Sequence, residues 1–148
     1  MKRIVVIVGA LLLGAGAVMA QQNQLRDTQA MMKDNGKNAG ALSAMVKGEK
    51  PYDQATVDAA LTQFDDTAKK LPTLFPQSIQ GKPFDGDYSP SSKIWEDKKG
   101  FDEHIASFAK VVSESKGKIR DLDTLKATLP VIGKQCGGCH ETYRIKKT

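Results

Sequence analysis

Hydrophobic residues recur at spacings of three and four in separate stretches of this chain, as they do on one face of an α-helix. Four stretches show this pattern: 25–46, 54–71, 94–112 and 122–143. No segment alternates between polar and apolar residues as a half-buried strand does, and none is repeated. The pattern therefore predicts an all-α protein, an antiparallel four-helix bundle.

The predicted helices begin and end at residues that favour such positions. Asp53 is placed to cap the second helix, Ser91 or Ser92 the third, and Asp121 or Asp123 the fourth. Gly48 and Pro51 follow the first helix, and Pro72 follows the second. Pro130 lies inside the fourth helix, where we expect a kink or a brief interruption.

A long irregular connection joins the second and third predicted helices. Residues 72–92 hold four prolines and two glycines, which rules out a continuous helix. The connection also carries Leu74, Phe75 and Phe84. These apolar residues predict that it packs on the bundle while crossing its body.

The N-terminus has the layout of a secretory signal peptide. Lys2 and Arg3 precede an apolar run over 4–13, and small residues follow as far as Ala20. The run is too short and too rich in glycine and alanine for a membrane span. We therefore predict a signal peptide over 1–20 and a single domain over 21–148.

The charge distribution argues against nucleic-acid binding. The chain carries 22 Lys and Arg against 17 Asp and Glu, a formal charge of +5. Removing Lys2 and Arg3 with the leader lowers this to +3, and the remaining lysines are interleaved with acids. The basic tail, with Arg144, Lys146 and Lys147, fits either simple solvation or the docking of a partner.

The chemistry of the chain is concentrated near its C-terminus, in Cys136-Gly-Gly-Cys139-His140. Two thiols three residues apart with a histidine after the second form the c-type haem attachment signature. Each thiol adds to one vinyl group of the porphyrin, and the histidine offers an imidazole nitrogen to the iron. All three residues continue the apolar face of the last helix, so a single covalent haem c would insert into the core.

Other uses of the cysteine pair have weaker support. An exported Cys-x-x-Cys pair can form a plain disulfide, and a thioredoxin-like redox pair needs a βαβ context that this pattern lacks. A zinc site needs two further ligands. His104 is the one other histidine, and its neighbour Glu103 makes a solvated imidazole the simpler expectation.

With this motif and bundle, the chain resembles the cytochrome c′ family, the class II cytochromes c. That family carries its haem motif on the last of four antiparallel helices, and the segment from Cys136 to Arg144 resembles it, including the aromatic-basic pair after the histidine. The resemblance implies that a residue of the first helix faces the other side of the iron. Cytochromes c′ place a non-ligating apolar residue there, whereas the cytochrome c-556 branch places a methionine.

The resemblance assigns the ligands. Met32 lies on the core stripe of the first helix and is the implied distal ligand, with Met31 in reserve and His140 as proximal ligand. By stripe position alone Met32 also fits ordinary core packing. Some family members carry an arginine where this chain has Thr28. The nearest base is Arg26, and Arg144, one turn after His140, is a second candidate for contact with a haem propionate or with the groups beside the iron; the sequence leaves open which of them neutralises the propionates.

Two aromatic residues complete the sequence-based expectations. Tyr143 is expected to pack in the core against the haem, and Trp95 to pack on either the porphyrin or the connection.

The resemblance implies a periplasmic monohaem cytochrome that carries single electrons through a low-spin His/Met haem and is not an enzyme. Its implied partners are redox proteins of an electron-transfer chain. We expect a monomer or weak homodimer, without nucleic acid and without stable membrane insertion. Two alternatives remain: a five-coordinate protein that binds nitric oxide or carbon monoxide, and a haem-free helical module held by a disulfide.

Overall fold

The computed structural model describes residues 24–84 and 86–147 in full, and of residues 2–23 only their place in the first helix. The predicted signal peptide, 1–20, therefore lies outside the fully described residues. In chain order the elements are α1 (Lys2–Val46), α2 (Gln54–Lys70), two 3-10 turns (Leu71–Thr73 and Gln77–Ile79), β1 (Tyr88–Pro90), α3 (Lys93–Glu96), α4 (Lys98–Lys118), α5 (Leu122–Tyr143) and β2 (Arg144–Lys146).

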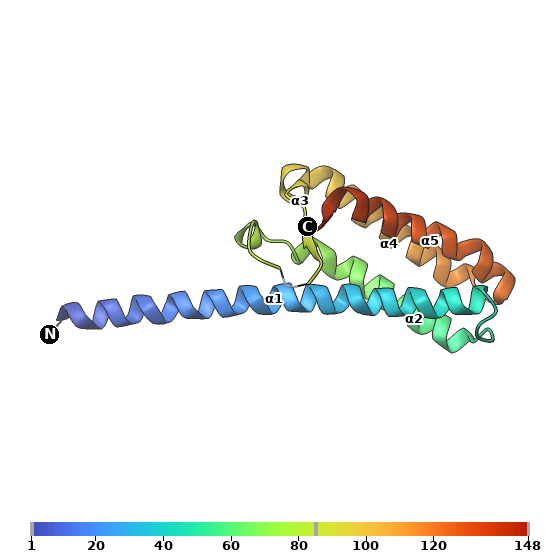
Figure 1. Ribbon diagram of the computed structural model, residues 1–148, viewed down its shortest axis with the longest axis horizontal. Coiled ribbons are helices and arrows are strands. Elements are labelled where there is room, and N and C mark those ends of the chain that lie inside the picture. Colours follow the sequence, from blue (N-terminus) through green and yellow to red (C-terminus); the bar gives the residue numbers. More distant parts are fainter. Residues whose placement is uncertain (1, 85, 148) are drawn as a thin grey trace.

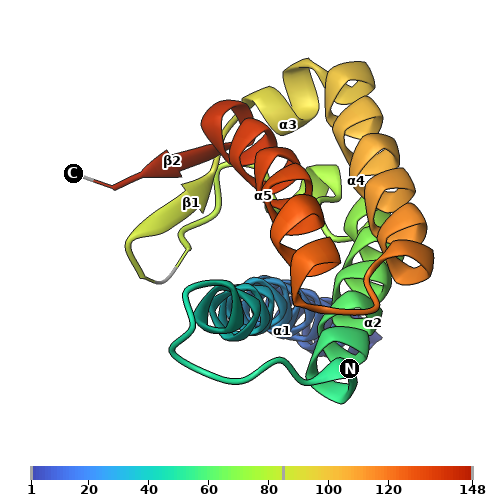
Figure 2. The ribbon, with the colours of Figure 1, turned by 90° about the vertical axis from the view of Figure 1, so that its right-hand side faces the viewer.

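The four long helices form one bundle. Helix α1 packs beside α2 and α5, and α4 closes the ring by packing on α2 and α5 (Figures 1 and 2). Of these four contacts, the one between α1 and α5 is the least extensive. The four-helix bundle predicted from the hydrophobic spacing is confirmed.

The bundle interior is built from the predicted apolar stripes. Buried members of this core come from all four long helices and include Leu42, Val57, Leu61, Phe64, Phe101, Ile105, Val112, Leu125 and Ile132. Burying large apolar side chains in this way is the main favourable contribution to folding.

The predicted caps of two helices are confirmed. The Asp53 carboxylate accepts a hydrogen bond from the Thr56 amide at 2.8 Å. Asp121 accepts one from the Thr124 amide at 2.8 Å, and the Thr124 hydroxyl accepts one from the Asp121 amide, which completes a capping box. Gly48, after α1, takes the left-handed backbone (φ 78°) that ends many helices.

The prediction of a single third helix is wrong, because the structure divides this stretch into the short α3 and the long α4. Asp97 ends the short α3 and caps α4, where its carboxylate accepts a hydrogen bond from the Gly100 amide at 3.1 Å. An aspartate at this point satisfies a free amide of the new helix, which favours a fresh start over a continuous helix. By contrast, α5 runs without interruption through the exposed Pro130.

The connection between α2 and α4 packs on the bundle, as predicted. Leu74 and Phe75 contact the main core, while Ile79 and Phe84 form a second buried cluster with Leu25. The Trp95 indole donates a hydrogen bond to the Phe75 carbonyl at 3.0 Å, so this tryptophan packs on the connection.

A short antiparallel ribbon is the feature that the sequence did not predict. Strand β1, from the connection, pairs with β2 at the C-terminal end of α5, with Pro90 opposite Arg144. Figure 2 shows this ribbon projecting beside the bundle next to α5. A three-residue strand is too short to show a periodic pattern in the sequence.

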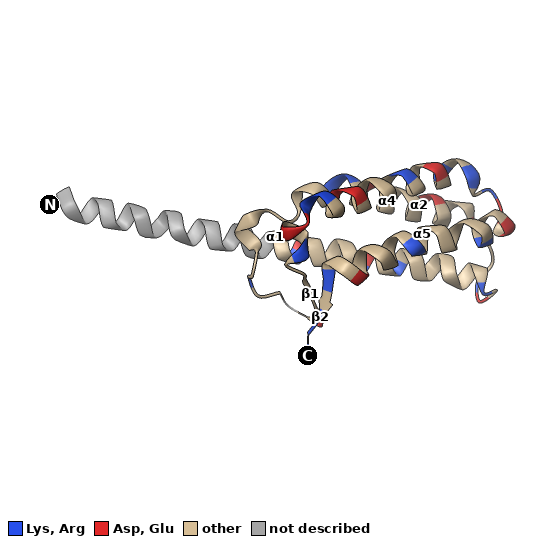
Figure 3. Cartoon of the chain, turned by 90° about the horizontal axis from the view of Figure 1, so that it is seen from above, with Lys and Arg blue, Asp and Glu red and all other residues tan. Residues whose placement is uncertain are grey.

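Charged residues of both signs are interspersed along the outer faces of the bundle (Figure 3). Most of the ion pairs among the described residues join exposed neighbours on one helix; one, between Lys116 and Asp65 at 2.7 Å, joins α4 to α2. Within the described part of the chain, no helix combines the length and apolar character that crossing a membrane requires.

Replacing Gly100 with alanine should destabilise the protein, although alanine is ordinarily the better helix former. The added Cβ would lie 2.7 Å from the Tyr143 hydroxyl and still closer to the Asp97 carboxylate. We expect a loss of about 1–3 kcal/mol, typical of overpacking. Urea unfolding of the variant measures it. The control is Gly117→Ala in the same helix, where a Cβ meets nothing within 4 Å, and which should unfold at equal or higher urea.

Candidate functional site

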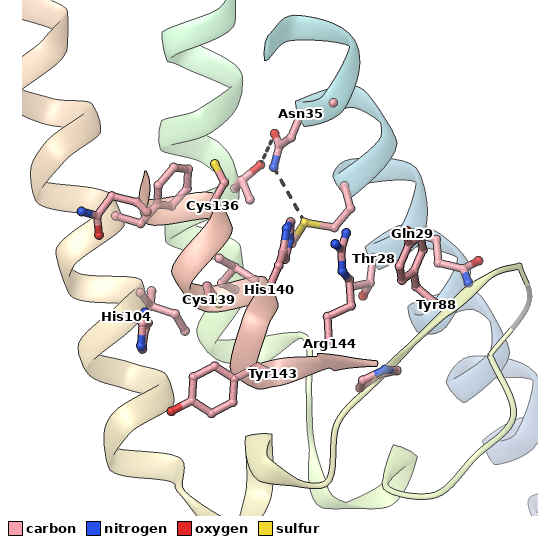
Figure 4. A pocket seen from close by; sticks show the side chains of 18 of the residues that line it. Thr28, Gln29, Asn35, Tyr88, His104, Cys136, Cys139, His140, Tyr143 and Arg144 are labelled. Atoms are coloured by element: carbon pink, nitrogen blue, oxygen red, sulfur yellow. Dashed lines mark hydrogen bonds between the residues drawn. The ribbon is translucent and has the colours of Figure 1, made fainter. Parts of the chain in front are cut away.

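A cavity of about 670 Å³ opens between α1, α5 and the ribbon, with α2 and α4 contributing to its walls. Its lining is mostly apolar and includes Phe64, Leu71, Phe101, Ile105 and Ile132. Figure 4 shows that side chains of α5 and of α1 face this space from opposite sides. The size and apolar lining are those of a cofactor site.

The α5 wall carries the predicted attachment residues. Cys136, Cys139 and His140 all line the cavity, because spacings of three and four place them on one face of the helix. All three are half-buried, and both cysteines are free thiols that pack against the main core. The structure therefore brings the whole motif to the cavity.

The ionisable groups of the motif are shifted toward their neutral forms. Burial raises the pKa of the Cys136 thiol, and burial followed by the neighbouring Cys136 raises the pKa of Cys139. Burial, with a smaller effect from Arg144, lowers the pKa of His140. A neutral imidazole keeps the nitrogen lone pair that metal ligation requires.

The α1 wall contributes Met32. This side chain is half-buried and lines the cavity together with Thr28, whereas Met31 is not among the lining residues. Thr28 is buried and donates its hydroxyl hydrogen bond to the Gln24 carbonyl at 2.8 Å. Of the two adjacent methionines, the structure brings Met32 to the site.

One rim of the cavity is formed by the ribbon. Arg144 lines the cavity and places its guanidinium 4.2 Å from the centre of the Tyr88 ring, a cation–π contact (Figure 4). Arg26 is exposed and is not among the lining residues. Sequence reasoning missed Tyr88, because only the pairing of β1 with β2 brings it here.

His104 is not simply solvated, as the sequence suggested. It is half-buried and lines the cavity, with its ring centre 5.5 Å from that of Tyr143. The packing of α4 against α5 places it there, which its exposed neighbour Glu103 could not reveal. Tyr143 is buried as expected, and its ring also contacts Phe101.

The Tyr143 hydroxyl should make stability depend on pH in the alkaline range. It donates a hydrogen bond to Asp97 at 2.8 Å, and burial followed by this carboxylate raises its pKa to about 12. The pKa of Tyr143 in the folded protein is above its value of about 10 in the unfolded chain. The stabilisation that the protonated hydroxyl gives to the folded state is therefore complete below pH 10 and is lost as the pH rises toward 12.

Tyr143→Phe measures this contribution. We expect the variant to be less stable than wild type by about 1 kcal/mol in urea unfolding at pH 8. The difference should shrink at pH 11.5, where the wild-type hydroxyl begins to ionise. A difference that is the same at both pH values would contradict the assignment.

The residues around the cavity fit a haem group. The space is large and apolar, two thiols one helical turn apart face it from α5, and a neutral imidazole lies beside them. An added Cβ at Gly133, which lines the cavity, would meet nothing within 4 Å, so the backbone of α5 is open at this point. No buried side-chain polar atom among the described residues lacks a hydrogen-bond partner.

Comparisons with known proteins agree with this geometry. The family model described as cytochrome C′ matches residues 23–144. A cytochrome c-556 of Rhodopseudomonas palustris is 60% identical over 148 residues, covering 99% of each chain.

Two solved structures resemble the fold. A structural model of oxidised R. palustris cytochrome c556 has 58% identity and a TM-score of 0.76, covering 86% of this chain and 99% of that one. The cytochrome c′ of R. palustris has 35% identity and a TM-score of 0.77, covering 84% and 98%. This chain therefore belongs to the cytochrome c′ family and is an electron-carrying protein that binds haem c.

Proposed function

We propose that this protein is a periplasmic single-electron carrier whose haem iron is ligated by His140 and Met32. The observation that carries the proposal is the position of Met32 in the cavity wall opposite the attachment helix. Cytochromes with histidine and methionine ligands are electron carriers with raised reduction potentials. When bound, the haem supplies an iron that takes up and releases one electron.

The chain's own residues would hold the group in four ways. The Cys136 and Cys139 thiols would each add S–H across a vinyl group to form a thioether. His140, neutral at physiological pH, would offer its imidazole nitrogen to the iron from α5. Met32 would offer its thioether sulfur from α1, and Arg144 at the rim is placed to neutralise a propionate.

Electron exchange of this kind asks no residue to act as acid, base or nucleophile, so we do not propose an enzyme. The apolar walls exclude water, and the helices hold His140 and Met32 at a fixed separation. Both effects keep the reorganisation energy of electron transfer small. The partners would be redox proteins that dock briefly over the cavity mouth through a small interface. We propose a monomer or weak homodimer.

Export is part of the same proposal. Residues 1–20 would act as a signal peptide, leaving 21–148 as the haem domain in the periplasm. The intact mass of the protein recovered from a periplasmic extract reports the cleavage site. A mature chain that does not begin at Gln21 would move this boundary.

The visible absorption spectrum of the purified holoprotein tests the proposed ligation. Oxidised and reduced samples are recorded with and without carbon monoxide. We expect a low-spin spectrum with a methionine–iron charge-transfer band and little response to carbon monoxide. A high-spin spectrum that responds readily to the gas would replace the proposal by gas binding at an open iron.

A further inference from the structure

We infer that Asn35 is a positioning residue for the Met32 thioether, holding the sulfur through a hydrogen bond. The inference rests on the proposed ligation of iron by Met32. Asn35 lies three residues after Met32 in α1, so the two side chains share one face of the helix. Both line the cavity.

The contact between them has a defined direction. The Asn35 amide nitrogen, Nδ2, donates to the Met32 sulfur, Sδ, at 3.9 Å (Figure 4). A thioether sulfur has two lone pairs and is a weak acceptor. If one lone pair is given to iron, the other remains free to accept this hydrogen bond.

Helix α2 fixes the orientation of the Asn35 amide. The amide oxygen, Oδ1, lies 3.4 Å from the Gln63 side-chain nitrogen, which can donate to it, and 2.9 Å from the Thr67 hydroxyl, whose one proton is shared between Oδ1 and the Gln63 carbonyl, also at 2.9 Å. Thr67 is only 1% exposed, so this anchor is inside the bundle. With Oδ1 held by α2, the NH₂ end of the amide is directed at the sulfur.

Such a donor should affect the iron through the sulfur. A hydrogen bond draws electron density from the thioether, and Fe(III) depends on that density more than Fe(II) does. The bond therefore favours the reduced state and raises the reduction potential. It also limits the rotamers of Met32, which keeps the sulfur aimed into the cavity before the haem is bound.

The test compares Asn35→Leu, which removes the donor at similar volume, with wild type. We expect the equilibrium constant for one-electron reduction to fall threefold to tenfold, tenfold being about 59 mV. The methionine–iron charge-transfer band should shift or weaken. Asn38→Leu, one turn further along α1 and outside the cavity lining, is the control and should keep the wild-type potential.

A second pair of variants covers the case in which Asn35→Leu does not fold. Thr67→Val removes the hydroxyl that holds Oδ1 and should lower the potential in the same direction by a smaller factor. Thr67→Ser keeps the hydroxyl and should have the same reduction potential as wild type. Thermal unfolding followed by circular dichroism confirms that each variant is folded.

The outcomes separate this inference from the proposed function. A wild-type protein with the charge-transfer band, combined with unchanged potentials in Asn35→Leu and Thr67→Val, would overturn the role of Asn35 and leave Met32 ligation standing. A wild-type protein without the band would overturn both. Lowered potentials in the two variants, with Asn38→Leu and Thr67→Ser unchanged, would establish the positioning role.

Discussion

Met32→Ala is expected to turn the protein from the proposed His/Met-ligated electron carrier into one that binds carbon monoxide readily. Under the proposed ligation, carbon monoxide must displace the Met32 sulfur in the wild type, so its apparent affinity is reduced by the fraction of molecules with a free sixth position. If that fraction is about 1% in the reduced protein, the variant binds carbon monoxide about 100-fold more tightly. Titration of the reduced protein with carbon monoxide, followed in the visible spectrum, measures the change.

Two further variants isolate the sulfur from the volume of the side chain. Met32→Leu keeps most of the volume but has no lone pair to offer, so it should also lose the methionine–iron charge-transfer band. Met31→Leu changes the adjacent residue, which is not among the cavity-lining residues, and should leave the band in place. Loss of the band in Met31→Leu instead would transfer the ligand role to Met31.

Replacing both Cys136 and Cys139 with serine releases the haem from the protein chain. Serine hydroxyls do not form thioethers with vinyl groups. On a denaturing gel stained for haem, the band of the double variant should therefore show no haem. Each single variant keeps one thiol and should retain stained protein in reduced yield. Stain that persists in the double variant would show that other residues attach the group.

The same double variant should also be less stable, because the haem would fill the centre of the bundle. A ligand present at about 1,000 times its dissociation constant contributes about 4 kcal/mol to the folded state. For a domain of this size such a loss lowers the melting temperature by about 15 °C. Thermal unfolding followed at 222 nm measures the loss, and the single variants should melt between the double variant and wild type.

The attachment motif shows why part of the site could be predicted. Cys136, Cys139 and His140 lie within five residues of one helix, and the period of 3.6 residues per turn places them on one face without reference to the rest of the fold. The same period identified the helix stripes, and the capping preference of aspartate identified Asp53 and narrowed the fourth cap to Asp121 or Asp123. Such features depend only on neighbours in the chain.

Other features of the fold and site could not be predicted, because they depend on contacts between segments that are distant in the sequence. His104 was expected in solvent, yet the packing of α4 on α5 makes it half-buried beside Tyr143. The break at Asp97 was missed because the apolar spacing continues across it, and the Tyr143 hydroxyl that meets its carboxylate comes from another helix. Tyr88 reached the rim only through strand pairing.

The sequence by itself determined that this is an all-α haem protein, and it predicted export and a haem attachment motif on the last helix. Hydrophobic period, capping residues and the Cys-Gly-Gly-Cys-His spacing are local properties, and each can be read from a single stretch. The stripe of the first helix already favoured Met32 over Met31, but only the tertiary structure decided how α2 orients the Asn35 amide toward the Met32 sulfur. That orientation depends on how α1 and α2 rotate and pack across the core, which is a property of the whole bundle.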